Sequence, residues 1–129
     1  MTTGFQSKKR VLLVEDEVLI AALAVDVLEE IGYSVAEATT AKAALDLAQP
    51  NPAAFDLAIV DLGLPDMPGD ELVVRLRELR PGFPVIVATG YGAKAMEDKL
   101  RGREALAYLS KPYDYNALVA AIHSLDGAS

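Results

Sequence analysis

Polar residues of three kinds, acidic, hydroxyl and basic, follow short apolar stretches of this sequence. They are Glu15 and Asp16 after Val11 to Val14, Asp61 after Leu57 to Val60, Thr89 after Val85 to Ala88, and Lys111 after Ala105 to Ser110. If each apolar stretch is a strand of one parallel sheet, the strands' carboxyl ends meet at one edge, where such sheets bind ligands. We therefore expect these five side chains to form one site.

The chemistry that suits this set is phosphoryl transfer. Glu15, Asp16 and Asp61 would repel one another unless a cation joined them, and Mg²⁺ prefers such oxygen ligands. Lys111 and Thr89 supply a positive charge and a hydroxyl donor for the oxygens of a phosphoryl group. Asp61 is then the expected nucleophile, since a carboxylate that attacks phosphorus forms an acyl phosphate.

Helical patterns alternate with these stretches. Leu19, Leu23, Val27 and Ile31 recur every four residues, which predicts a helix from Val18 to Ile31, and Gly32 is suited to end it in the left-handed conformation. A second helix is predicted from about Ala41 to Gln49 after a Thr39 or Thr40 cap, and a third from Asp70 to Arg80 with Leu72, Val73, Leu76 and Leu79 buried. A fourth is predicted from Ala93 to Leu100. The last begins after Asp114, with Leu118, Ala121, Ile122 and Leu125 on its apolar face.

With a further strand at Tyr33 to Ala38, five strands alternate with five helices. This order predicts an α/β fold whose parallel sheet is covered by helices on both faces, with right-handed crossovers. We expect one domain over residues 10–125, with an N-terminal tail at 1–9 and a C-terminal tail at 126–129.

The composition excludes several classes of protein. The 129 residues contain no cysteine, which rules out disulfides, thiolate metal sites and cysteine nucleophiles and fits the cytoplasm. A net charge of −7 disfavours direct binding to nucleic acid. The acidic run Glu15 to Glu17 ends the first apolar stretch too early for an export signal, and Val18 to Val25 is far shorter than the roughly 20 residues that span a membrane.

Four short motifs resemble the receiver domain of two-component response regulators. They are Val14-Glu15-Asp16-Glu17, Val60-Asp61-Leu62-Gly63-Leu64-Pro65, Ala88-Thr89-Gly90 and Ser110-Lys111-Pro112. They occur in the family's order, each at the end of a predicted strand, and the resemblance covers about residues 10 to 125. It implies the flavodoxin-like doubly wound sheet with strand order 2-1-3-4-5 that such a receiver exemplifies.

The resemblance also implies residue roles. Asp61 would accept a phosphoryl group from a histidine kinase or phosphotransfer protein, with Mg²⁺ held by Glu15, Asp16, Asp61 and the carbonyl of Gly63. Thr89 and the aromatic Tyr108 would form the switch, and a cis bond between Lys111 and Pro112 would orient the lysine. Such a domain is a signalling switch rather than a turnover enzyme. A downstream target, or a second copy of the chain, would bind the face made by the fourth helix, fifth strand and fifth helix.

Two positions depart from the commonest family pattern. Glu15 replaces an aspartate, and its extra methylene group puts direct metal binding in doubt. Tyr91, two residues after Thr89, is bulky and is expected to slow the loss of phosphate by obstructing water.

Two alternative functions stay open. The chain could be a pseudo-receiver, a binding module of the same fold that is never phosphorylated, although its intact acids, hydroxyl and lysine argue against this. A flavin carrier or phosphatase on a similar sheet is disfavoured, because Glu15 to Glu17 would repel a cofactor phosphate and Gly63 stands where such a phosphatase needs a second acid. We expect a stand-alone, single-domain receiver whose output lies in trans, with a receiver excised from a larger protein as the alternative.

Overall fold

A computed structural model describes residues 9–90 and 106–127, with only the backbone for 126 and 127. The strands are β1 (Lys9–Val14), β2 (Tyr33–Ala38), β3 (Leu57–Asp61), β4 (Val85–Thr89) and β5 (Leu106–Ser110). The helices are α1 (Val18–Glu30), α2 (Ala41–Ala48), α3 (Gly69–Leu79) and α5 (Tyr115–Gly127), with a 3₁₀ turn, η2 (Pro52–Ala54), before β3. The predicted fourth helix and Tyr91 lie outside the described residues.

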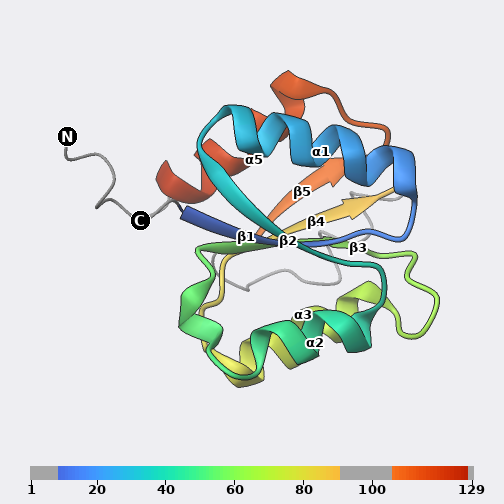
Figure 1. The fold of residues 1–129 in the computed structure, drawn as a ribbon, viewed down its shortest axis with the longest axis vertical. Coiled ribbons are helices and arrows are strands. Elements are labelled where there is room, and N and C mark those ends of the chain that lie inside the picture. Colours follow the sequence, from blue (N-terminus) through green and yellow to red (C-terminus); the bar gives the residue numbers. More distant parts are fainter. Residues whose placement is uncertain (1–8, 91–105, 128–129) are drawn as a thin grey trace.

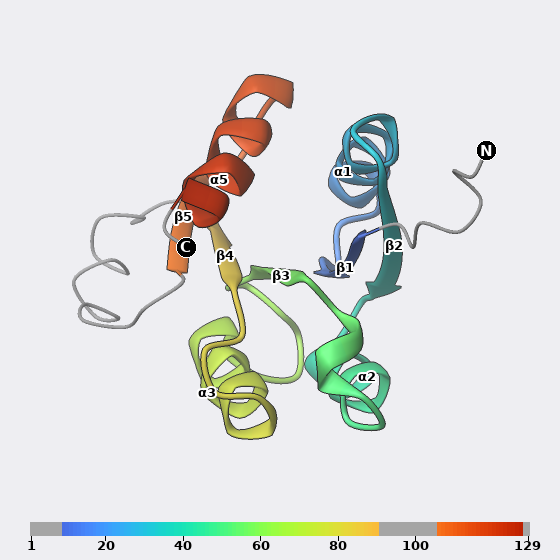
Figure 2. The same cartoon turned by 90° about the vertical axis from the view of Figure 1, so that its left-hand side faces the viewer.

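The five strands form one parallel sheet in the order β2-β1-β3-β4-β5, which confirms the predicted strand order. Helices α1 and α5 lie on one face of the sheet and α2 and α3 on the other, so the fold is doubly wound (Figures 1 and 2). In the described part of the chain, no helix is long and apolar enough to cross a membrane.

Strand β1 shows how the sequence builds both faces. Successive side chains of a strand point to opposite faces. Val11 and Leu13 accordingly join the apolar cluster of α1 and α5, while Leu12 and Val14 join that of α2 and α3. All four are buried, as a strand covered on both sides requires.

The helix ends follow the predicted signals. Thr40 caps α2 by accepting a hydrogen bond from the amide of Ala43, and Asp114 accepts one from the amide of Ala117 at the start of α5. Gly32 follows α1 with a φ of 101°, a left-handed conformation that glycine adopts without strain.

Helix α1 buries a different set of residues from the four that recur every four positions. Its buried side chains are Ala21, Ala24 and Leu28, whereas Leu19 and Leu23 are 82% and 61% exposed. The recurrence therefore predicted the helix but does not mark its packed face. Ala21, Ala24 and Leu28 pack on the sheet, whereas Leu19 and Leu23 face outward.

Candidate functional site

The polar residues predicted to converge do lie at one edge of the sheet. Asp61 is the last residue of β3 and Thr89 the last of β4, and they are only 4% and 7% exposed. Glu15 comes directly after β1 and is 3% exposed. Lys111 follows β5, and its amide donates a 2.7 Å hydrogen bond to the carbonyl of Thr89. The parallel register thus brings together residues that are up to 96 positions apart.

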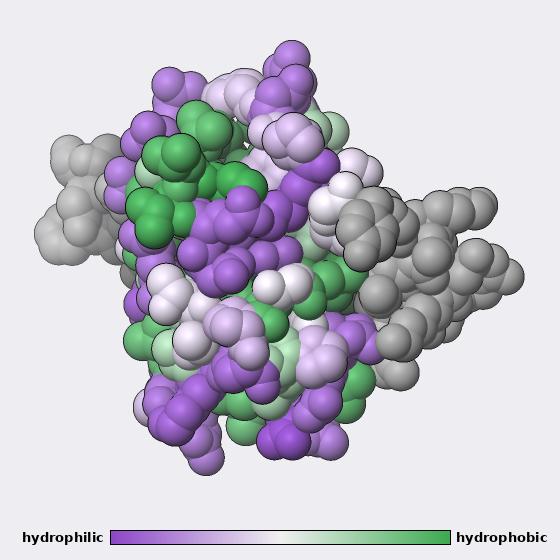
Figure 3. Space-filling model, turned by 90° about the vertical axis from the view of Figure 1, so that its right-hand side faces the viewer, coloured by the Kyte–Doolittle hydropathy of each residue, from purple (hydrophilic) through white to green (hydrophobic). Residues whose placement is uncertain are grey.

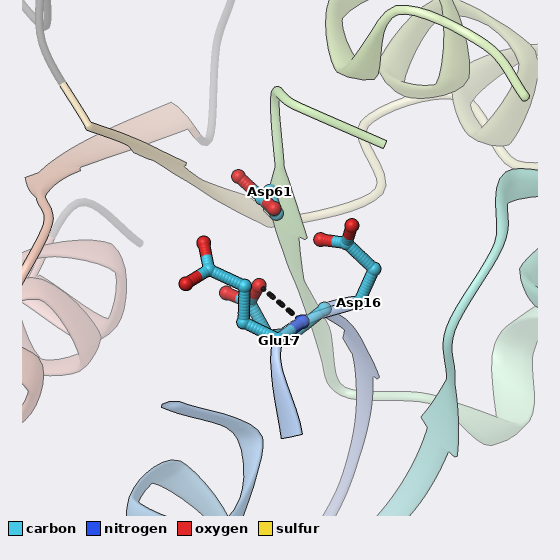
Figure 4. A group of neighbouring side chains, drawn as sticks. Asp16, Glu17 and Asp61 are labelled. Carbon is cyan, nitrogen blue, oxygen red and sulfur yellow. Dashed lines mark hydrogen bonds between the residues drawn. The ribbon is translucent and has the colours of Figure 1, made fainter. Parts of the chain in front are cut away.

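Four carboxylates surround the centre of this edge. Ligand oxygens of Glu15, Asp16, Glu17 and Asp61 all lie within 4.8 Å of one another. Figure 4 shows Asp16 and Glu17, from the segment after β1, pointing towards the same space as Asp61 from β3. Oxygen donors in this number and at this spacing suit a hard divalent cation such as Mg²⁺.

The ammonium group of Lys111 lies among the carboxylates. Its Nζ is 3.2 Å from Glu15 Oε1, 3.1 Å from Glu17 Oε1 and 3.3 Å from Asp61 Oδ1. The Lys111 side chain is 8% exposed, so its pairs with the buried Glu15 and Asp61 are largely shielded from water, whereas the pair with Glu17 faces solvent on the Glu17 side. The predicted cis bond between Lys111 and Pro112 is present.

The pKa shifts follow from burial and crowding of like charges. Burial, and next to it the charge of Asp61, raise the pKa of Glu15 to about 7, although hydrogen bonds from the Glu17 amide and Lys111 oppose the shift. Burial and Asp61 also raise the pKa of Asp16. Burial alone would lower the pKa of Lys111, but hydrogen bonds to Glu17 and Glu15 outweigh it and raise that pKa.

Backbone contacts fix the phosphoacceptor candidate in place. The amide of Gly63 donates a 3.1 Å hydrogen bond to Asp61 Oδ1. Gly69 begins α3 beside the same residue, and a Cβ atom there would lie 2.6 Å from the Asp61 carbonyl oxygen and from Leu62 Cα. Only glycine lets the chain pass this close to the end of β3.

The loop after β3 is also tied to α2. Asp66 accepts hydrogen bonds from the amides of Ala41 and Lys42, at 2.9 and 3.0 Å, and these bonds lower its pKa. The loop that carries Gly63 is therefore anchored at both ends, by Asp61 and by Asp66.

The candidate switch residue Tyr108 lies on β5, opposite Val87 of β4 and two residues before the level of Thr89. It is half-buried and packs against the apolar cluster of α2 and α3. The structure thus places Thr89 and Tyr108 on neighbouring strands, whereas Tyr91 lies outside the described residues.

Sequence reasoning did not assign two residues that the structure places at this edge. Glu17 pairs with Lys111, and the signal for it was its place in an unbroken acidic run before α1. The Tyr113 hydroxyl is buried and has no hydrogen-bond partner among the described residues, and burial, with the Glu15 charge next, raises its pKa to about 12. No motif marked Tyr113, because its burial depends on packing against the cluster of α1 and α5.

Comparison with known proteins decides the family. Residues 11–123 match the family model of the response regulator receiver domain. This chain belongs to that family. A receiver domain is a switch of two-component signalling rather than a turnover enzyme, and such domains receive phosphoryl groups from histidine kinases or phosphotransfer proteins.

The similar proteins include a single-domain relative. The response regulator receiver protein CpdR of Brucella abortus is 32% identical over 91% of this chain and 96% of its own length. Two other curated relatives are longer, and the chain spans only 13% and 61% of their lengths.

Solved structures agree with the fold. A CheY-like receiver domain protein from Methanospirillum hungatei is 35% identical, with a TM-score of 0.81 over 95% of this chain and 97% of its own. A response regulator protein from Burkholderia pseudomallei, solved with a phosphorylated aspartic acid, calcium ion and citrate, is 32% identical. Its TM-score is 0.76 over 88% of this chain and 65% of its own.

Proposed function

We propose that this receiver domain accepts a phosphoryl group on Asp61 from a phosphohistidine of a kinase or phosphotransfer protein in the cytoplasm. The observation that carries the proposal is the position of Asp61, a buried strand-end carboxylate 3.3 Å from a lysine ammonium and within 4.8 Å of three other carboxylates. A phosphorylated aspartic acid and a calcium ion in the similar Burkholderia pseudomallei protein support it.

The residues fit Mg²⁺, because among the described residues four carboxylates cluster around one ammonium, which pairs with three of them, and the surplus negative charge needs a cation. Glu15, Asp16, Asp61 and the carbonyl of Gly63 would hold it, and when bound it would neutralise charge on the attacking and transferred oxygens.

In the transfer step, a carboxylate oxygen of Asp61 attacks phosphorus. The new bond is oxygen to phosphorus, the bond from phosphorus to the donor's imidazole nitrogen breaks, and its electron pair leaves with the nitrogen. Lys111 is close enough to Asp61 to bind a phosphoryl oxygen by a small movement of its ammonium group. Thr89 would donate its hydroxyl to another oxygen, and both contacts stabilise charge as it develops.

The output of the switch follows from the same contacts. We propose that Thr89 moves towards the phosphoryl group and that Tyr108 turns inward with it, since the two residues lie on adjacent strands. This shifts the population between two arrangements of the face that includes β5 and α5. A target protein, or a second copy of the chain, would bind there in trans; the predicted fourth helix of that face lies outside the described residues.

The phosphoryl donor is proposed to dock over the beginning of α1. Val18, Leu19 and Leu23 are 77%, 82% and 61% exposed and lie in the first two turns of α1, which begins directly after Glu17, the partner of Lys111. Figure 3 shows a hydrophobic patch over this end of α1, next to a hydrophilic area. A protein whose histidine reaches Asp61 must cover this part of the surface, and exposed apolar patches mark protein contacts.

A pocket of about 280 Å³ extends this patch towards α5. It is lined by Leu23, Val27, Tyr113, Asp114, Tyr115 and Leu118. Such a pocket suits an apolar anchor side chain of the donor. Leu19→Ser should slow transfer from the cognate phosphohistidine protein at least tenfold and leave labelling by acetyl phosphate unchanged, whereas equal loss with both donors would argue against docking here.

The central test is phosphorylation by acetyl phosphate with Mg²⁺, followed by intact-protein mass spectrometry. The wild type should gain one phosphoryl group, Asp61→Asn none, and the surface control Asp26→Asn as much as the wild type. Labelling of Asp61→Asn to the wild-type level would refute the proposal.

The pseudo-receiver alternative makes opposite predictions. It would show no saturable Mg²⁺ binding and no response to beryllofluoride, which imitates the phosphoryl group. A pull-down with and without beryllofluoride should identify the target protein, because the face that includes β5 and α5 should differ between the unmodified and the beryllofluoride-bound protein.

A further inference from the structure

Lys111 already pairs with three carboxylates in the unphosphorylated protein. A lysine ammonium has three N–H donors and no acceptor. Its Nζ lies between 3.1 and 3.3 Å from oxygens of three carboxylates, those of Glu15, Glu17 and Asp61. Two of these contacts, to Glu15 and Glu17, are hydrogen bonds, and the contact with Asp61 is an ion pair.

The three partners differ in how freely they can move. The side chains of Glu15 and Asp61 are 2% and 5% exposed, and Glu15 also accepts a 3.1 Å hydrogen bond from the Glu17 amide. The side chain of Glu17 is 60% exposed and has no helix-capping contact, although it immediately precedes α1. Glu17 is thus the outermost partner of Lys111, and its charge faces any molecule that enters.

We infer that Glu17 is a positioning residue that holds Lys111, offsets its charge and thereby disfavours small anionic phosphoryl donors. This inference rests on the proposed phosphorylation of Asp61. It adds that Glu17 helps to determine which class of phosphoryl donor the domain accepts. A carboxylate oxygen of Glu17 lies within 4.8 Å of one of Asp61, so a phosphoryl group bound at Asp61 feels both the lysine and this glutamate.

The size of the effect follows from the charge of the donor. At about 5 Å in water, removing the unit charge of Glu17 changes the rate of Asp61 labelling about three- to fourfold for each unit of charge on the phosphoryl donor. A dianion such as acetyl phosphate should therefore gain about tenfold when Glu17 is neutralised, and a monoanion such as phosphoramidate about threefold. A protein donor depends less on this charge, because contacts over α1 contribute to its binding.

Glu17→Gln is the informative substitution. Glutamine keeps the length of the side chain and an oxygen that accepts a hydrogen bond from Lys111, but removes the charge. Glu30→Gln is the matched control, since Glu30 is an exposed acid at the far end of α1 and the net charge changes equally. Labelling by the two small donors is measured at low salt with saturating Mg²⁺.

The expected result is faster labelling of Glu17→Gln by both donors, with the larger gain for acetyl phosphate and smaller gains at high salt. Unchanged rates, or equal gains for both donors, would overturn the inference. So would slower labelling with weaker Mg²⁺ binding by calorimetry, because Glu17 would then be a metal ligand.

A second measurement needs no phosphorylation. Proton exchange of the Lys111 ammonium group with water, followed by ¹⁵N NMR in the metal-free protein, should be faster in Glu17→Ala, which removes the acceptor, than in the wild type or Glu30→Ala. Equal exchange would show that Glu17 does not hold Lys111. Failure of the wild type to be labelled would instead refute the proposed function, so the two failures are distinguishable.

Discussion

Neutralising Asp61 should stabilise the metal-free protein even though it abolishes phosphorylation. Among the residues that the structure describes, Asp61 lies within 4.8 Å of three other carboxylates and has one ammonium neighbour, at 3.3 Å. Asparagine at this position keeps an oxygen to accept the hydrogen bond from the Gly63 amide. The substitution therefore removes the charge without removing that contact.

The magnitude follows from Coulomb's law. A carboxylate pair at 4.8 Å costs about 1 kcal/mol in water and about 3.5 kcal/mol at an effective dielectric constant of about 20. The buried Glu15 approaches the higher value and the exposed Asp16 and Glu17 the lower, giving a repulsion of at least about 5.5 kcal/mol, because 4.8 Å is the upper limit of these separations. The lost attraction to the Lys111 ammonium, a buried pair at 3.3 Å, offsets about 5 kcal/mol at the same dielectric constant of about 20, so Asp61→Asn should gain about 0.5 kcal/mol or more.

The assay is urea denaturation in EDTA, followed by far-UV circular dichroism because the chain has no tryptophan. Asp26→Asn, which neutralises an exposed acid on α1, controls for net charge. Mg²⁺ at ten times its dissociation constant should add about 1.4 kcal/mol to the wild type and less to Asp61→Asn. A variant that is less stable than the wild type in EDTA would refute the electrostatic account of the site.

Three further predictions concern single residues. The free energy of unfolding in EDTA should fall by about 2 kcal/mol as pH rises from 4.5 to 7. The reason is that folded Glu15, whose pKa is about 7, holds its proton more tightly than the unfolded chain does. Urea denaturation of Glu15→Gln over the same pH range should show no such fall. Gly69→Ala should cost about 2 kcal/mol or more, seen as a lower thermal midpoint, since its Cβ would meet backbone atoms at 2.6 Å; a wild-type midpoint would contradict this. Asp66, whose pKa is lowered, stabilises the fold above about pH 4 and loses this contribution as pH falls through its folded pKa, so Asp66→Asn should flatten the acid limb of the stability profile.

The strands and the site edge were predictable because their signals are local. A stretch such as Val85 to Ala88 is apolar at every position, which is typical of a strand covered on both faces, and the polar residue that ends it marks the sheet edge. Because all strands are parallel, knowing that Asp61 and Lys111 each follow a strand was enough to place them together. Convergence of the predicted residues needed topology alone.

The packed face of α1 was not predictable in the same way. Leu19 and Leu23 belong to the apolar recurrence, yet they face outward while Ala21, Ala24 and Leu28 pack on the sheet. The rotation of a helix about its axis is set by the space beneath it, which residues distant in sequence create. An apolar stripe kept for a partner protein has the same period as one kept for the core.

The sequence by itself determined which side chains stand at the carboxyl ends of the strands, and therefore the chemistry that Asp61 and its neighbours can support. Only the tertiary structure decided how they share one ammonium group, that Glu17 belongs to the set, and which side of α1 stays open. The physical reason is range: strand ends are marked by a few adjacent residues, whereas charge pairing with Lys111 depends on atoms brought within about 3 Å by segments 94 to 96 positions apart.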